Sequence, residues 1–346
     1  MRDGSTTLYL GAAGVIWALD YLERAGLAPA LPDFAGLMPH LAQQNRREYA
    51  SFGWYPRHAS LLMGDVGVML VTMRIAPNPA TADALERRTL ENLALPPLEL
   101  MWGLPGTMLA ALFMAQATHE ARWRTLFERQ AERLLSELKD TDHGPLWVQE
   151  LYGSSQAYLG PVHGFAGQML ALARGWDWLN EAQRVRIARS IERTLQLNAR
   201  EAAGLANWPA LAGEKGTPYL TQYCHGAPGI VASFAAIKLS SSVLDDLLRR
   251  AGELVWRAGP LRKGGGLCHG TAGNGYALLK LYGRTGNTVW LERARAFAMS
   301  AIDQCHAAKR RYGKGRYTLW TGDLGLAVYL YDCLRGEAKF PTIDVL

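Results

Sequence analysis

The sequence has few cysteines and no concentrated block of charge. Four cysteines in 346 residues are too few for the disulfide framework of a secreted protein, so we expect reduced thiols and a cytoplasmic location. The N-terminal residues Met1–Ser5 lack the apolar region of a signal peptide. The net charge is +6 and no block rich in lysine or arginine dominates, so nucleic acid is not an expected partner.

A membrane-spanning run is also missing. Residues Leu100–Thr118 carry no charge, but Gly103, Pro105 and Gly106 interrupt this stretch, which indicates a loop that leads into a buried helix. The alternation of apolar and polar residues that is typical of strands is absent as well. With 49% hydrophobic residues, the chain has ample material for the core of an all-α globular protein.

What the sequence does contain is a repeat. A Gly-x-x-Gly pair followed at once by an apolar run occurs seven times, and consecutive first glycines lie 39 to 62 residues apart. The pairs are Gly11/Gly14, Gly64/Gly67, Gly103/Gly106, Gly164/Gly167, Gly226/Gly229, Gly270/Gly273 and Gly322/Gly325. Recurrence of this kind indicates a repeat architecture, in which glycine allows backbones to approach closely.

Two kinds of helix are expected in each repeat unit. The runs Thr107–Ala115, Ile230–Ile237 and Leu326–Leu334 are apolar nearly all round, which is typical of buried helices. The stretches His119–Asp140 and Leu244–Gly259 have the i, i+3, i+4, i+7 spacing of surface helices. Each unit is therefore predicted to pair an outer amphipathic helix with an inner apolar helix.

The seven units are expected to close on themselves. An open stack needs a polar capping repeat, whereas the last unit here ends in an apolar run with only a short tail after it. We therefore predict one domain over residues 1–346, built as a closed double ring, although length alone suggests about two domains.

The two residues before the first glycine differ between units, and this is where chemistry is expected. Units five and six carry Cys224-His225 and Cys268-His269, and unit four carries His163 in the second position. Zinc prefers cysteine and histidine ligands, and catalytic sites use three of them and leave one position open. Because equivalent loops of a ring lie side by side, we predict a zinc site here. A general acid or base role is expected for His163.

Three segments resemble the lanthionine synthetase C-like family. They are Tyr158–Gly167 (YLGPVHGFAG), Tyr223–Gly229 (YCHGAPG) and Gly266–Gly273 (GLCHGTAG). The resemblance covers essentially the whole chain. It is closer to the eukaryotic-type members than to the bacterial lantibiotic cyclases, which usually have tyrosine at the position of His225. It implies an α/α toroid, a double ring of inner and outer helices with one Zn²⁺ per chain. Family members usually have a longer leading segment than the ten residues that precede Gly11 here, so we expect the first outer helix to be missing.

The resemblance also implies roles for individual residues. His163 matches the acid/base histidine of the family, and Lys263 matches a lysine that eukaryotic-type members use near the reacting thiol. Glu99 falls where members have a catalytic or supporting carboxylate, which would orient His163. His225 is a candidate second acid or hydrogen-bond partner. The implied zinc ligands are Cys224, Cys268 and His269.

The implied activity is addition of a thiol to dehydroalanine or dehydrobutyrine in proteins or peptides, which gives a thioether. The thiolate attacks the β-carbon, His163 protonates the α-carbon, and Lys263 stabilises the enolate or binds carboxylates of the thiol substrate. The YCHGAPG motif and Lys263 favour glutathione as the thiol. The cyclases use a peptide cysteine instead and have a basic residue in the region where Leu220 and Thr221 stand here.

Two alternatives stay open. The first alternative is a lanthionine-forming peptide cyclase. The second is a toroid that keeps zinc for structure and binds a peptide or protein at its rim without catalysis. All three functions need the Cys and His cluster, but only catalysis needs His163 and Lys263.

Overall fold

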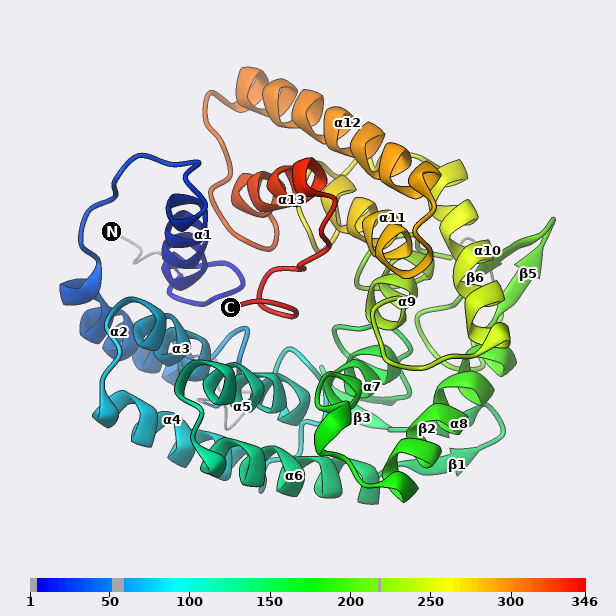
Figure 1. Cartoon of the computed structure of the whole chain (residues 1–346), viewed down its shortest axis with the longest axis horizontal. Helices are drawn as coiled ribbons and strands as arrows, with labels where there is room; N and C mark the ends of the chain where they lie inside the picture. Colours follow the sequence, from blue (N-terminus) through cyan, green and yellow to red (C-terminus); the bar gives the residue numbers. More distant parts are fainter. Residues whose placement is uncertain (1–4, 52–58, 217–218) are drawn as a thin grey trace.

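The computed structural model describes residues 5–51, 59–216 and 219–346. Over these residues thirteen α-helices alternate between an inner and an outer position (Figure 1). The inner helices, each beginning directly after the first glycine of a pair, are α1 (Ala12–Arg24), α3 (Asp65–Ile75), α5 (Leu104–Thr118), α7 (Phe165–Arg174), α9 (Ala227–Phe234), α11 (Thr271–Thr285) and α13 (Asp323–Arg335). The outer helices are α2 (Met38–Ser51), α4 (Pro79–Asn92), α6 (Ala121–Ser136), α8 (Glu181–Asn198), α10 (Ser242–Ala258) and α12 (Thr288–Tyr312).

The alternation follows the predicted pattern of apolar and amphipathic helices. Helix α5 is buried from Leu104 to Met114, whereas α6 buries one face that includes Trp123 and Phe127. In the part of the chain that the structure describes, α1 has no helix before it, while every other inner helix follows an outer one. No described helix combines the length and the apolar character needed to cross a membrane. Residues 1–4, most of the segment that argued against a signal peptide, lie outside the described residues.

The inner helices form a closed ring. Helix α1 contacts α3 on one side and α13 on the other, so the first and last units of the chain are neighbours (Figure 1). The second glycine of each pair packs against the preceding unit. A Cβ at Gly67 would lie 3.0 Å from the Cβ of Leu8, and a Cβ at Gly14 would lie 3.0 Å from the Cβ of Leu319. The contact between Gly14 and Leu319 closes the circle.

Backbone hydrogen bonds connect the loops at one end of this ring. The amide of Cys224 donates to the carbonyl of Cys268 (3.3 Å), and the amide of Cys268 donates to the carbonyl of Trp320 (2.9 Å). The series continues from Trp320 to Tyr9 (3.2 Å) and from Tyr9 to Leu62 (2.9 Å). All five residues stand two positions before the first glycine of their units. These hydrogen bonds hold the variable positions of neighbouring units side by side.

Three short β-hairpins among the described residues depart from the all-α prediction. Two of them close with two-residue turns of positive φ, at Tyr152-Gly153 (53° and 79°) and Ala203-Gly204 (50° and 75°), which suit a type I′ turn. Strands of three residues are too short to produce a visible alternation, so the sequence pattern did not reveal them. The antiparallel pairs are β1 (Lys139–Thr141) with β2 (Gly144–Leu146), β3 (Gln149–Leu151) with β4 (Ser154–Gln156), and β5 (Arg200–Ala202) with β6 (Leu205–Asn207).

The C-terminal segment turns back into the middle of the ring (Figure 1). The ring of Phe340 stacks on Tyr223 with centroids 4.4 Å apart. The indole of Trp320 donates to the hydroxyl of Thr342 (3.1 Å). Because Tyr223 and Trp320 belong to the loops of units five and seven, the segment supports the end of the ring where the variable positions lie.

A buried carboxyl group on α13 holds the start of this segment. Asp332 is 1% exposed and accepts hydrogen bonds from the hydroxyl of Tyr276 and the backbone amide of Lys339, both at 2.9 Å. Burial raises the pKa of Asp332 to about 7, against the two hydrogen bonds, which lower it. The contact between α13 and the C-terminal segment is therefore sensitive to pH.

Two glycines of α11 test the role of the close contacts. A Cβ at Gly273 would lie 1.7 Å from the carbonyl oxygen of Leu267, whereas a Cβ at Gly283 would meet nothing within 4 Å. We expect Gly273→Ala to lower the free energy of unfolding by about 1–3 kcal/mol. Gly283→Ala should raise it by about 0.5–1 kcal/mol, because alanine favours a helix. Chemical denaturation of both variants measures this, and equal effects would contradict the packing argument.

The variant Asp332→Asn tests the buried carboxyl group. The folded-state pKa of about 7 lies above the value of an unfolded chain, about 3.9. Between these values the folded protein keeps a proton that the unfolded chain releases, so this group lowers the free energy of unfolding as pH rises, by at most about 1.4 kcal/mol per pH unit. Asparagine does not titrate. Chemical denaturation at pH 5 and pH 8 should show that the free energy of unfolding of Asp332→Asn, relative to the wild type, is higher at pH 8 than at pH 5. An equal difference at both pH values would refute the raised pKa of Asp332.

Candidate metal centre

Three predicted ligands come together at the end of the ring where the inner helices begin. The ligand atoms of Cys224, Cys268 and His269 all lie within 4.8 Å of one another, and Sγ of Cys268 is 3.8 Å from Nε2 of His269. Both cysteines are buried and the histidine is exposed. Two thiols and an imidazole are donors that zinc prefers, and three protein ligands are typical of catalytic sites. The cluster therefore fits a metal ion.

The loop that carries Cys224 is held in one conformation. Gly226 has φ +98°, and a Cβ there would lie 2.0 Å from the carbonyl oxygen of Leu220, so this position requires glycine. The side-chain oxygen of Asn207, at the end of β6, accepts a hydrogen bond from the amide of Ala227 (2.7 Å). One of the unpredicted hairpins thus anchors the loop of a candidate ligand.

The two thiols affect each other strongly. The hydrogen bond from Cys268 lowers the pKa of Cys224 to about 4, with a further contribution from His269, even though burial acts in the opposite direction. The hydrogen bond with Cys224, burial and the charge on Cys224 all raise the pKa of Cys268. The protein alone thus favours one thiolate, and binding of a cation would release the second proton.

Two residues that contact these thiols were not predicted from the sequence. The side-chain amide of Gln222 donates from Nε2 to Sγ of Cys224 (2.9 Å), and its Oε1 accepts from Nζ of Lys263 (2.7 Å). Tyr9 hydrogen bonds to Cys268. Burial is the main cause that raises the pKa of the tyrosine, and its interactions with Cys268 raise it further. Tyr9 occupies the variable position of unit one, next to that of unit seven, so ring closure was the signal that could have identified it.

His163 and Glu99 form a second group. The Nδ1 atom of His163 is 2.8 Å from Oε2 of Glu99, whose side chain is fully buried. The carboxylate is fixed by the backbone amides of Met101 (3.1 Å) and Trp102 (2.6 Å). Because a carboxylate accepts hydrogen bonds, Nδ1 carries the proton, and Nε2 is the atom available for proton exchange.

His225 interacts electrostatically with members of both groups. Its pKa is lowered by burial first, and also by positive charge on His163 and His269. Its Nδ1 atom is buried without a hydrogen-bond partner among the described residues. A Cβ at Gly160 would lie 3.4 Å from this atom and 2.0 Å from the carbonyl oxygen of Cys224, so the loop of unit four packs directly against that of unit five.

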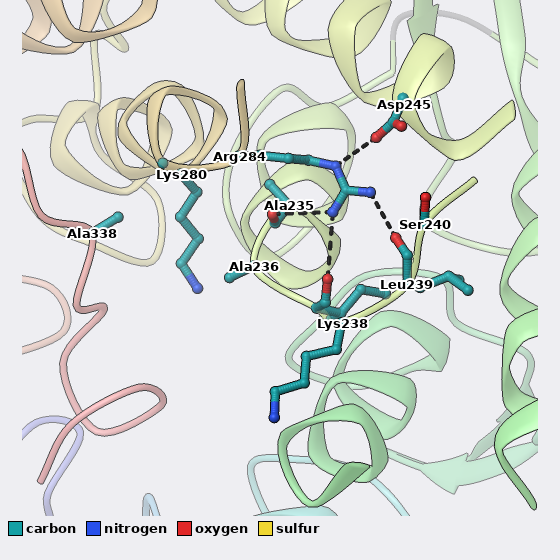
Figure 2. Close-up of a pocket in the computed structure, with 11 residues that line it drawn as sticks. Ala235, Ala236, Lys238, Leu239, Ser240, Asp245, Lys280, Arg284 and Ala338 are labelled. Carbon is teal, nitrogen blue, oxygen red and sulfur yellow. Dashed lines mark hydrogen bonds and ion pairs between the residues drawn. The ribbon is translucent and has the colours of Figure 1, made fainter. Parts of the chain in front are cut away.

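A cavity of about 680 Å³ lies away from this site. It is lined by residues at the C-terminal ends of α9 and α11 (Figure 2), whereas the candidate metal cluster lies at their N-terminal ends; α11 alone spans about 22 Å. The guanidinium of Arg284 donates to the carbonyls of Ala235 and Leu239 and pairs with Asp245 (Figure 2). This cation caps the end of α9, so the cavity is separate from the candidate centre.

Comparison with known proteins agrees with these features. The family model for the lanthionine synthetase C-like protein matches residues 2–345. The chain belongs to the lanthionine synthetase C-like family. This LanC-like chain is 27% identical over 322 residues to the zebrafish protein "Glutathione S-transferase LANCL1", an alignment that covers 84% of this chain and 75% of the relative. It is 33% identical over 147 residues to "LanC-like protein GCL1" of Arabidopsis thaliana, which covers 40% and 33% of the two chains.

A solved structure supports the fold of this LanC-like protein. Nisin cyclase superposes with a TM-score of 0.60 at 16% sequence identity, covering 97% of this chain and 95% of that chain. At this identity the likeness concerns the fold alone. Together with the closed ring of inner helices, it supports the toroid. The relation to zebrafish and Arabidopsis proteins confirms the predicted similarity to eukaryotic-type members.

Metal analysis tests the cluster. We expect the purified LanC-like protein to contain about one zinc ion per chain, because its donor set has the number and type of ligands of a zinc site. Cys268→Ser and His269→Ala should lose most of it, whereas Cys305→Ser on α12 should keep it. Elemental analysis measures the metal, and circular dichroism checks that each variant is folded. A folded Cys268→Ser protein with a full complement of zinc would rule out this ligand set.

Proposed function

We propose that this LanC-like protein is a zinc-dependent enzyme that adds a thiol to dehydroalanine or dehydrobutyrine in peptides or proteins, with glutathione as the thiol. The observation that carries the proposal is the Cys224–Cys268–His269 cluster beside a loop that holds a carboxylate-oriented histidine, His163. The relation to a protein named as a glutathione S-transferase supports the choice of thiol. We also propose a cytoplasmic location, where glutathione keeps cysteines reduced.

The metal would supply one chemical effect. Zn²⁺ held by the cluster would lower the pKa of a thiol that reaches it, so that the sulfur reacts as a thiolate at neutral pH.

The protein side chains would manage the protons. The sulfur forms a bond to the β-carbon of the dehydroamino acid, and the π electrons of the carbon–carbon double bond move to give an enolate. Protonated His163 then donates a proton from Nε2 to the α-carbon, and Glu99 keeps the ring in the orientation for this transfer. Solvent takes the thiol proton and returns one to His163. The net reaction adds S–H across the double bond, with no change in redox state.

Lys263 would provide positive charge next to the reacting sulfur. Its ammonium uses one donor on Gln222, and the others remain for the enolate oxygen or for a carboxylate of glutathione. The lowered pKa of His225 favours its neutral ring, which suits a hydrogen-bond partner better than a proton donor.

A direct assay tests the proposal. The zinc-loaded protein is incubated with glutathione and a dehydrobutyrine-containing peptide, and mass spectrometry detects the thioether. His163→Ala should lower the rate by about 10²–10⁴-fold while zinc is retained. His306→Ala, an exposed histidine on α12, is the matched control and should be fully active.

Other outcomes identify the alternatives. A peptide that contains its own cysteine and forms only an internal thioether would indicate a cyclase. Zinc-loaded wild-type protein that binds the peptide without forming any product would refute catalysis and favour a binding toroid.

A further inference from the structure

A single buried glutamine connects the candidate metal ligand to the candidate catalytic lysine. Gln222 is 4% exposed. Its Nε2 donates to Sγ of Cys224 at 2.9 Å, and its Oε1 accepts from Nζ of Lys263 at 2.7 Å. Lys263 lies 41 residues away in the sequence and belongs to the loop of unit six, so the contact crosses between two repeat units.

The chemistry of the two neighbours fixes which way the amide points. A lysine ammonium only donates hydrogen bonds, so the oxygen of Gln222 must face Lys263. The amide NH₂ group must then face Cys224, where a thiolate is an acceptor. With the amide reversed, an NH₂ group would face the ammonium and an oxygen would face the sulfur, so both contacts would be unfavourable.

The backbone around Gln222 keeps the side chain in place. The amide of Gln222 donates to the carbonyl of His225, and the amide of His225 donates to the carbonyl of Gln222, both at 3.0 Å. This tight turn puts Gln222 and Cys224 on one short, doubly hydrogen-bonded segment. Lys263 is exposed, and the hydrogen bond to Gln222 ties its ammonium to this segment.

We propose that Gln222 is a positioning residue with two functions, an inference that rests in part on the proposed activity. It donates a hydrogen bond to the Cys224 thiolate in the metal site, and it holds the ammonium of Lys263 beside that site. Leu220 and Thr221, which precede Gln222 in the same loop, carry no charge. Gln222 brings the positive charge of Lys263 into this region from the neighbouring unit.

Three variants separate the two functions. Gln222→Met has a similar length and removes both hydrogen bonds. Gln222→Glu keeps an oxygen for Lys263 but has no N–H for Cys224. Lys263→Met removes the cation and leaves the bond to Cys224. Gln130→Met is the matched control, because Gln130 is a buried glutamine on α6 that donates to Thr107 (2.8 Å) and is remote from the thiols.

The first readout does not depend on activity. Zinc affinity is measured by competition with a chromophoric chelator, and the cobalt-substituted protein reports on the sulfur ligands through its sulfur-to-metal charge-transfer band. We expect Gln222→Met to weaken zinc binding by about 10–100-fold and to shift the band, and Gln222→Glu to shift it as well. Lys263→Met and Gln130→Met should keep both properties. Wild-type affinity and band in folded Gln222→Met and Gln222→Glu would overturn the metal-site function.

The second readout is the kinetics of glutathione addition. Lys263→Met and Gln222→Met should each lower kcat/KM, and the double variant should lose little more than Gln222→Met alone, because both act on the same ammonium. Gln222→Glu should keep the part of the activity that depends on Lys263. Fully additive losses would overturn the positioning of Lys263.

The two readouts distinguish the failure of this inference from the failure of the proposed function. If no variant and no wild-type protein forms the thioether, the proposed activity is wrong, and the zinc and cobalt measurements still decide whether Gln222 acts on Cys224. If the wild type is active and the Gln222 variants behave like Gln130→Met in both readouts, the proposed activity stands and the role of Gln222 is refuted.

Discussion

The close contact between each second glycine and the preceding loop is the constraint on which the rest of this structure depends. A side chain at these positions would collide with the backbone of its own loop and with the neighbouring unit. Because glycine has no side chain, successive loops come close enough for backbone hydrogen bonds such as that from the amide of Cys224 to the carbonyl of Cys268. Ligands 44 residues apart in the sequence therefore become neighbours. The candidate metal centre therefore depends more on the geometry of the ring than on any local motif.

The same geometry arranges the chemistry in order around the ring. Unit four supplies His163, and unit three supplies the buried Glu99 that orients it. Units five and six supply the thiols and the imidazole, and unit six also supplies Lys263, held through Gln222. Packing of Gly160 against the carbonyl of Cys224 sets the two groups side by side. The candidate acid, the candidate metal ligands and the candidate cation thus come from consecutive loops, and each contacts a neighbouring unit.

The sequence was sufficient to predict the features that repeat. All seven inner helices begin directly after predicted glycines. The equivalence of two loops predicted a cluster of cysteine and histidine, and the resemblance to the lanthionine synthetase C-like family implied the set Cys224, Cys268 and His269. Features without a counterpart in other units were not predictable in this way. The hairpins have strands of three residues and no periodicity, yet Asn207 of β6 anchors the Cys224 loop. Gln222 was missed because its contacts depend on the direction of one amide, which is set by a lysine 41 residues away.

Closure of the ring has a consequence for how this chain reaches its native state. Gly14 packs against Leu319, so helix α1 finds one of its two neighbours only after synthesis has reached unit seven. Contacts between residues so distant in sequence are slow to form. Synthesis proceeds from the N-terminus, so α1 is made long before α13, and until then the growing chain would be an incomplete arc with an apolar edge on α1. That edge is a place where a partly made chain is open to aggregation until α13 and the C-terminal segment arrive.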